Sequence, residues 1–111
     1  MLRTDFEHTE PTRAEIDALR GPVLLEFGSP TCGHCRRAQP LVEQALAGQP
    51  EVRHIKVADG PGQPLGRSFR VKLWPTLVFM RDGAERARSV RPSSSAEIEE
   101  GLHRIVGAQD R

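Results

Sequence analysis

The stretch Val23-Leu-Leu-Glu-Phe-Gly-Ser-Pro-Thr-Cys-Gly-His-Cys35 holds the residues that decide the fold of this 111-residue chain. It opens with a nearly continuous apolar run bounded by Gly-Pro and Gly-Ser-Pro, which is typical of a strand covered on both faces. A helical pattern follows over 33–47, where apolar residues recur at i, i+3, i+4, i+7 and i+8 from Ala38. The cysteine pair therefore falls between a buried strand and the start of a helix.

The remaining sequence predicts that helices and strands alternate. Thr12 and Glu15 fit a capping box at the start of a helix that should end near Arg20. Asp82-Gly83 is a strong hairpin signal between two strands. Apolar patterns predict the other elements, which are strands at 52–57, 76–80 and 86–90, helices at 65–69 and from Ser95, and a weak strand at 2–6.

This order of elements predicts a single α/β domain over residues 1–111. Helices between the first buried strands imply parallel pairing, and the hairpin adds an antiparallel edge. The expected architecture is a mixed central β-sheet with helices on both faces. The terminal helix should bury a stripe of four residues, Ile98, Leu102, Ile105 and Val106.

The composition excludes several classes of protein. Hydrophobic residues make up 37% of the chain, and 16 basic against 15 acidic residues give a net charge of +1. These values are ordinary for a globular domain and exclude a disordered chain or a strongly basic nucleic-acid binder. No window approaches the ~18 consecutive apolar residues of a membrane span. The first residues lack the apolar core of a secretory signal, so we expect a cytoplasmic protein.

The charge is nevertheless unevenly distributed. Residues 67–91 contain seven basic and two acidic residues, whereas the first 26 residues contain three basic and six acidic residues. Such a segment is usually a solvated face, but near a binding site it could attract acidic partners. Few aromatic residues interrupt the basic segment, so we do not expect nucleic-acid binding.

Cys32 and Cys35 form a Cys-Gly-His-Cys motif whose position suggests thiol chemistry, since two cysteines are too few for the disulfide framework of a small secreted protein. Cys32 should lie at or just before the first helical turn, where free backbone N–H groups and the helix dipole favour a thiolate. His34, with the arginines that follow the motif, could add positive charge. Cys35, one turn further and facing the core, could then attack a mixed disulfide formed at Cys32.

Two other interpretations of the pair remain open. The motif could be half of a zinc site completed by His34, His54 or His103, although the sequence has no second Cys-x-x-Cys or His-x-x-x-His pair. The cysteines could also be purely structural. Neither alternative accounts for the placement between strand and helix as well as redox chemistry does, so we predict no metal site.

The chain resembles the thioredoxin family through the opening stretch, Pro40, Leu73-Trp-Pro-Thr76 and Asp82-Gly83. The resemblance covers nearly the whole chain and implies the thioredoxin fold, with the cysteines at a helix start. It also implies a cis bond between Trp74 and Pro75, close to the cysteines, and a role for Trp74, Pro75 and Thr76 in binding client chains. Trp74 could instead be a core aromatic residue.

Glu26 is the only acid in an otherwise apolar strand. A buried carboxylate without a partner is costly, so Glu26 should be neutral or paired, unless its strand is exposed at an edge. The resemblance implies that Glu26 transfers the proton of Cys35, because family members often carry an aspartate at this place. Lys56 is similar to the lysine that often accompanies that acid, although it could be an ordinary solvated lysine.

The sequence also departs from the family pattern. Gly28 and Thr31 replace the usual tryptophans before the cysteines, and the chain has no tyrosine, so the aromatic recognition surface is reduced. Arg91 stands where a glycine is typical and could crowd or redirect the client groove. His34 replaces the usual proline and resembles protein disulfide isomerases, which predicts a redox potential between those of the two groups.

Together these features predict a thiol–disulfide oxidoreductase that reduces or exchanges protein disulfides through Cys32 and Cys35. We expect Glu26 and His34 to assist, Arg91 to contact clients, and no bound cofactor to be needed. A separate reductase should supply electrons to a monomeric protein with no membrane or nucleic-acid partner. The alternative is a non-catalytic binding module or assembly chaperone of the same fold.

Overall fold

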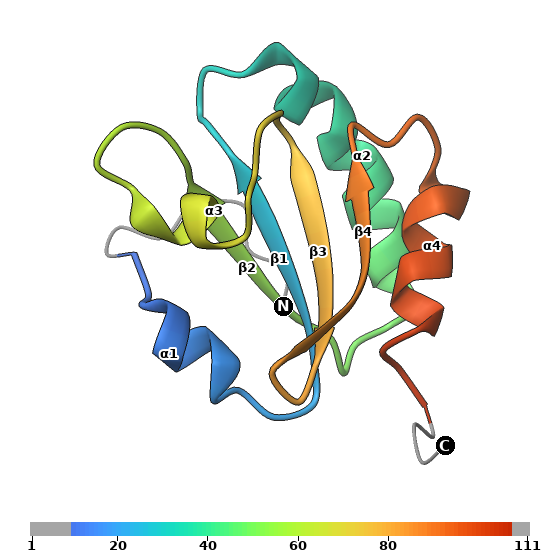
Figure 1. Ribbon diagram of the computed structural model, residues 1–111. Helices are drawn as coiled ribbons and strands as arrows, with labels where there is room; N and C mark the ends of the chain where they lie inside the picture. The colour runs from blue at the N-terminus through green and yellow to red at the C-terminus, as the bar shows by residue number, and fades with distance from the viewer. Residues whose placement is uncertain (1–9, 108–111) are drawn as a thin grey trace.

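A computed structural model describes residues 10–107 of the chain as a four-stranded sheet with helices on both faces (Figure 1). The strands are β1 (Pro22–Gly28), β2 (Arg53–Ala58), β3 (Thr76–Arg81) and β4 (Ala84–Val90). The helices are α1 (Arg13–Asp17), α2 (Gly33–Ala47), α3 (Pro64–Ser68) and α4 (Ser95–His103). The strand order is β2-β1-β3-β4, with β1 parallel to β2 and the other neighbours antiparallel. The mixed sheet predicted from the sequence is confirmed, while the weak strand predicted at 2–6 lies outside the described residues.

Side chains alternate across the sheet and build two apolar cores. Val23, Leu25 and Phe27 of β1 face α1 and α3, where they join Ile16 and Phe69. Leu24, on the other face, joins residues of α2 and α4 in the second core, and three of the four residues predicted for the terminal stripe, Ile98, Leu102 and Ile105, are buried there. Because β1 is central and covered on both faces, its one acidic residue is also buried.

A capping box starts α1, and a tight turn joins β3 to β4. The Thr12–Glu15 capping box forms as predicted, but α1 ends at Asp17, earlier than the predicted end near Arg20. The residues after α1 turn the chain toward β1, and the Gly21 N–H donates to the Asp82 carboxylate at 2.7 Å. Asp82 and Gly83 both have positive φ, at 52° and 82°, as a tight hairpin turn requires.

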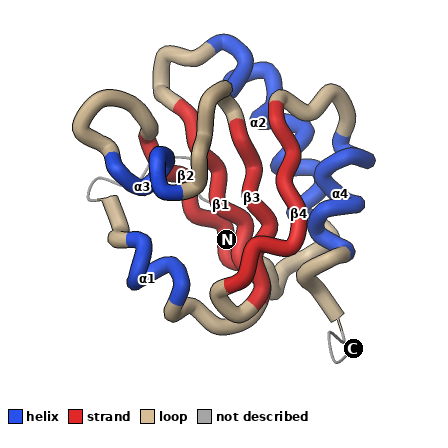
Figure 2. The backbone as a smooth tube through the Cα atoms, in the orientation of Figure 1, coloured by secondary structure: helices blue, strands red, loops and turns tan. Residues whose placement is uncertain are grey.

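Three connecting segments meet at one end of the sheet. Figures 1 and 2 show the start of α2, the loop that enters β3 and the end of β4 at the upper edge of the molecule. The antiparallel pairing of β1 with β3 and of β3 with β4 brings the end of β1, the start of β3 and the end of β4 to this edge. The site described below lies here. Between residues 10 and 107, no helix is long and apolar enough to cross a membrane.

Candidate active site

Cys32 caps the N-terminus of α2, as the sequence predicted. Its backbone is extended (φ −82°, ψ 119°), and its Sγ accepts a hydrogen bond from the Cys35 N–H at 3.2 Å. Cys32 is partly exposed, whereas Cys35 is buried, with 5% of its surface exposed. Both thiols are free. The helix thus presents one sulfur atom to solvent and holds the other beneath it.

The two thiols differ strongly in acidity. Partial burial acts to raise the pKa of Cys32, but hydrogen bonds from the Cys35 thiol and from the backbone N–H groups of Cys35 and His34, together with the charge of Arg91, leave this pKa below its ordinary value. Burial raises the pKa of the Cys35 thiol to about 12. The hydrogen bond between the Cys35 and Cys32 side chains and the negative charges of Cys32 and Glu26 also raise this pKa. Cys32 is therefore the thiol that loses its proton more readily.

The positive charge beside Cys32 comes from Arg91 and not from His34. Desolvation, Arg91 and Arg37 all lower the pKa of His34, and Arg37 Nη2 lies 2.8 Å from His34 Nδ1, which places an acceptor nitrogen there. His34 is therefore neutral at neutral pH, which corrects the expectation that its imidazole adds charge. Its backbone N–H still stabilises the Cys32 thiolate.

Arg91 reaches back from the end of β4 to the loop that carries Trp74 and Pro75. The Trp74–Pro75 bond is cis, which confirms the prediction. The Arg91 N–H donates to the Pro75 carbonyl at 3.0 Å, and Arg91 Nε donates to the Trp74 carbonyl at 2.8 Å. Arg91 adopts a φ of 51°, a conformation that favours glycine, so these two contacts hold a strained residue in place.

Trp74 is anchored by a residue that the sequence analysis did not single out. Trp74 is half-buried and belongs to neither apolar core, so the interpretation as a core aromatic residue is wrong. Its Nε1 donates to Asp59 Oδ2 at 2.9 Å. Gly66 leaves room for this carboxylate, because a Cβ there would lie 2.1 Å from Asp59 Oδ1.

Thr76 is the first residue of β3, and its side chain is buried. Its side chain is 1% exposed, and its hydroxyl donates to the Leu73 carbonyl at 2.6 Å. The hydroxyl therefore supports the loop before β3, and a role of Thr76 in client binding stays a prediction. Pro75 is also buried, whereas Leu73 is 48% exposed and offers an apolar surface beside Trp74.

Glu26 lies beneath Cys35 in a small polar cluster. It is 1% exposed, as predicted for an acid in a covered strand, and its Oε1 lies 2.7 Å from His54 Nε2. Lys56 is also buried, so it is not an ordinary solvated lysine, and its Nζ donates to Gln39 Oε1 at 2.6 Å. Sequence reasoning considered His54 only as a zinc ligand. Because His54 and Lys56 are two residues apart on one predicted strand, the sequence did indicate that their side chains share one face of the sheet.

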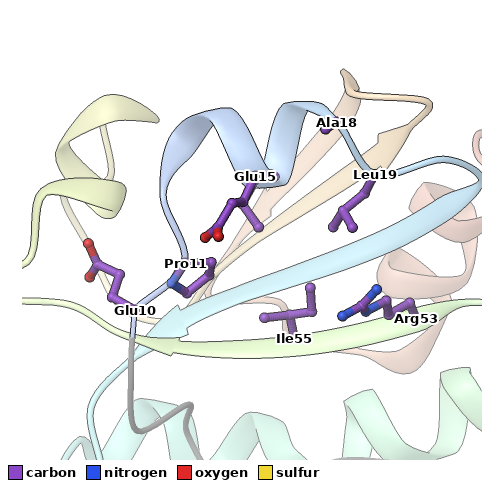
Figure 3. Close-up of a pocket in the computed structure, with 8 residues that line it drawn as sticks. Glu10, Pro11, Glu15, Ala18, Leu19, Arg53 and Ile55 are labelled. Atoms are coloured by element: carbon purple, nitrogen blue, oxygen red, sulfur yellow. The ribbon is translucent and has the colours of Figure 1, made fainter.

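One hollow in the protein surface adjoins this site, and a larger one lies elsewhere. One hollow of about 340 Å³ lies beside the motif, between α2 and the loop after β4, and includes His34, Arg37 and Arg91. A hollow of about 490 Å³ lies under α1 (Figure 3), with Glu10, Leu19 and Arg53 among its lining residues but neither cysteine. Within the described part of the chain, no three His, Cys, Asp or Glu side chains gather in a way that could hold a metal ion.

A mixed sheet that positions a Cys-x-x-Cys motif at a helix start, close to a cis-proline loop, defines the thioredoxin class of folds. Comparison with known families agrees, since the thioredoxin family model matches residues 6–104. The chain belongs to the thioredoxin family.

The similar proteins within that family include both protein disulfide-isomerases and thioredoxins. Protein disulfide-isomerase A2 of Pongo abelii is 38% identical over 91 residues, which cover 77% of this chain but only 17% of that protein. Thioredoxin of Chlamydia trachomatis is 34% identical over 70 residues, covering 63% of this chain and 69% of that protein. The solved structure of reduced thioredoxin 2 from Pseudomonas aeruginosa PAO1 superposes with a TM-score of 0.82 at 54% identity, covering 92% of this chain and 94% of that one.

Proposed function

We propose that this protein is a thiol–disulfide oxidoreductase that reduces or exchanges disulfides of client proteins in a reducing cytoplasm. The observation that carries the proposal is the difference in exposure and in pKa between the two thiols. Cys32 is accessible and has a lowered pKa, whereas Cys35 is buried and its pKa is raised to about 12. A nucleophile and a resolving thiol need this difference.

In the proposed reaction, the Cys32 thiolate attacks a client disulfide and forms a mixed disulfide. Cys35 then loses its proton and attacks Cys32 Sγ, which releases the reduced client and leaves a Cys32–Cys35 disulfide. Glu26, whose charge acts on Cys35, is placed to receive that proton. A separate reductase returns the pair to two thiols, and the chain's own residues perform the exchange without a bound cofactor.

The loop before β3 supports binding of an extended client. Leu73 is 48% exposed and Trp74 is half-buried, so both offer apolar surface close to Cys32. Arg91 adds a positive charge at the same edge, which favours clients with an acidic residue near the disulfide. The printed names of the relatives, thioredoxin and protein disulfide-isomerase, fit this class of reaction.

Titration against glutathione redox buffers tests the proposal. Groups that stabilise the Cys32 thiolate stabilise the reduced protein and make the couple more oxidising. We expect Cys32 and Cys35 to form a reversible disulfide with a potential between the ~ −270 mV of thioredoxin and the ~ −180 mV of protein disulfide isomerase. The fraction oxidised can be read by alkylation and mass spectrometry. Failure to form the intramolecular disulfide would favour the non-catalytic binding module, and a potential at or below that of thioredoxin would refute the predicted range.

A further inference from the structure

Three polar side chains, Glu26, His54 and Lys56, are buried on the face of the sheet that α2 covers, and Gln39 of α2 is partly buried beside them. Glu26 of β1 pairs in register with Lys56 of β2, and His54 precedes Lys56 by two positions, so all three face the same side of the sheet. Lys56 reaches Gln39, which follows Cys35 by four residues and lies on the same face of α2. The polar cluster therefore extends from His54 to the helix turn that carries Cys35.

The contact between Glu26 and His54 is short, and both side chains are buried. Oε1 of Glu26 lies 2.7 Å from Nε2 of His54, and the two side chains are 1% and 2% exposed. Nδ1 of His54 finds no hydrogen-bond partner among the described residues. The imidazole thus depends on Glu26 for its one polar contact in this part of the chain, and the hydrogen bond that joins the two groups requires a proton on one of them.

Few titratable side chains surround the Glu26–His54 pair among the described residues. An unpaired polar group would be costly at this buried site, so the short contact between Glu26 and His54 compensates both groups for their loss of water. The titratable groups that face the pair are Lys56 from β2 and Cys35 from α2. The facing residues of β3 and α4 are apolar, namely Leu77, Phe79, Ile98 and Leu102.

We propose that His54 and Glu26 act as one proton-holding pair, which receives the Cys35 proton when the mixed disulfide is resolved. This inference rests on the proposed oxidoreductase function and adds His54 to its machinery as a positioning and proton-sharing residue. An imidazole is suited to the task, because it gains and loses a proton near neutral pH.

Resolution of the mixed disulfide moves one proton and one electron pair. The Cys35 S–H bond breaks, and its proton goes to the Glu26–His54 pair. The Cys35 sulfur forms a bond with Cys32 Sγ, while the bond between Cys32 and the client sulfur breaks. The electron pair leaves with the client thiolate, which takes up a proton from the pair or from solvent. The two cysteines are oxidised to a disulfide, and the client disulfide is reduced to two thiols.

A stopped-flow reaction with the aromatic disulfide dithiobis(nitrobenzoate) at equimolar concentration separates the two steps. Attack by Cys32 releases the first coloured thiolate, and resolution by Cys35 releases the second. Because this thiolate is a good leaving group, removal of the Cys35 proton should limit the second phase. The variants are His54→Val, which removes the partner of Glu26, and His54→Gln, which keeps a hydrogen-bond donor but cannot share a proton. His103→Gln, at an exposed position of α4, is the matched control.

We expect the first phase to stay within about twofold of wild type in all variants, since the Cys32 environment is untouched. The second phase should slow by about tenfold or more in both His54 variants and lose one ionisation from its pH profile, whereas His103→Gln should match wild type. If His54→Gln restores both the rate and the pH profile, or if both His54 variants match His103→Gln, the proposal is wrong. Absence of the first phase in the wild-type protein would instead refute the proposed function itself.

Discussion

Replacing Cys35 by serine is expected to turn the transient mixed disulfide into a stable adduct. Serine keeps the size of the side chain but supplies no thiol to attack Cys32 Sγ, so the client sulfur has no internal route of release. Cys32 keeps the helix N-terminus and the Arg91 charge that favour its thiolate, although it loses the hydrogen bond from the Cys35 thiol. Attack should therefore proceed, and release should stop.

The adduct can be measured with insulin as a model client. After incubation of Cys35→Ser with insulin whose disulfides are intact, non-reducing mass spectrometry should show insulin attached to Cys32, and dithiothreitol should remove it. The double variant Cys32→Ser/Cys35→Ser is the control and should form no adduct. Attachment to the double variant, or none to Cys35→Ser, would contradict the assigned roles.

Replacing Cys32 by serine should abolish catalysis of disulfide reduction. The thiolate is the attacking group, and an alcohol at the same position is not ionised at neutral pH. Cys35 cannot take over, because its sulfur is buried and burial raises its pKa to about 12. Reduction of insulin by dithiothreitol, followed by turbidity, should fall to the rate without protein.

A matched control separates this loss from damage to the helix. Ala47→Ser introduces the same hydroxyl at an exposed position at the other end of α2 and should leave turnover unchanged. Circular dichroism should show the same fold for both variants. Substantial turnover by Cys32→Ser would mean that another group performs the attack.

The fold and the placement of the two cysteines at a helix start were predictable because their signals are local. A strand covered on both faces is indicated by an apolar run, and a helix by apolar residues that recur about every 3.6 positions. The hairpin is indicated by Asp82-Gly83. The motif's position also predicted the difference in burial, since Cys32 precedes the first helical turn and Cys35 lies within that turn, facing the core.

The side-chain contacts around the site could not be predicted from the sequence, because they depend on strand register and on loop conformation. The contact between His54 and Glu26 exists because β2 pairs with β1 in one particular register, and a shift of one residue would send His54 to the other face. The effect of Arg91 depends on a positive φ that turns its side chain toward Trp74. Neither property is visible in the order of residue types.

The central claim is that Cys32 attacks and Cys35 resolves, and the pH dependence of alkylation tests it most directly. Reduced wild-type protein is pulse-labelled with iodoacetamide across a pH series, and mass spectrometry of fragments assigns the label to each cysteine. Cys32 should react first, with a midpoint below the ~8.5 of a free thiol, because its pKa is lowered. Cys35 should stay unlabelled at neutral pH and react only in strong alkali, because its pKa is about 12. Equal labelling of the two, or a Cys32 midpoint at or above the value of a free thiol, would contradict the account.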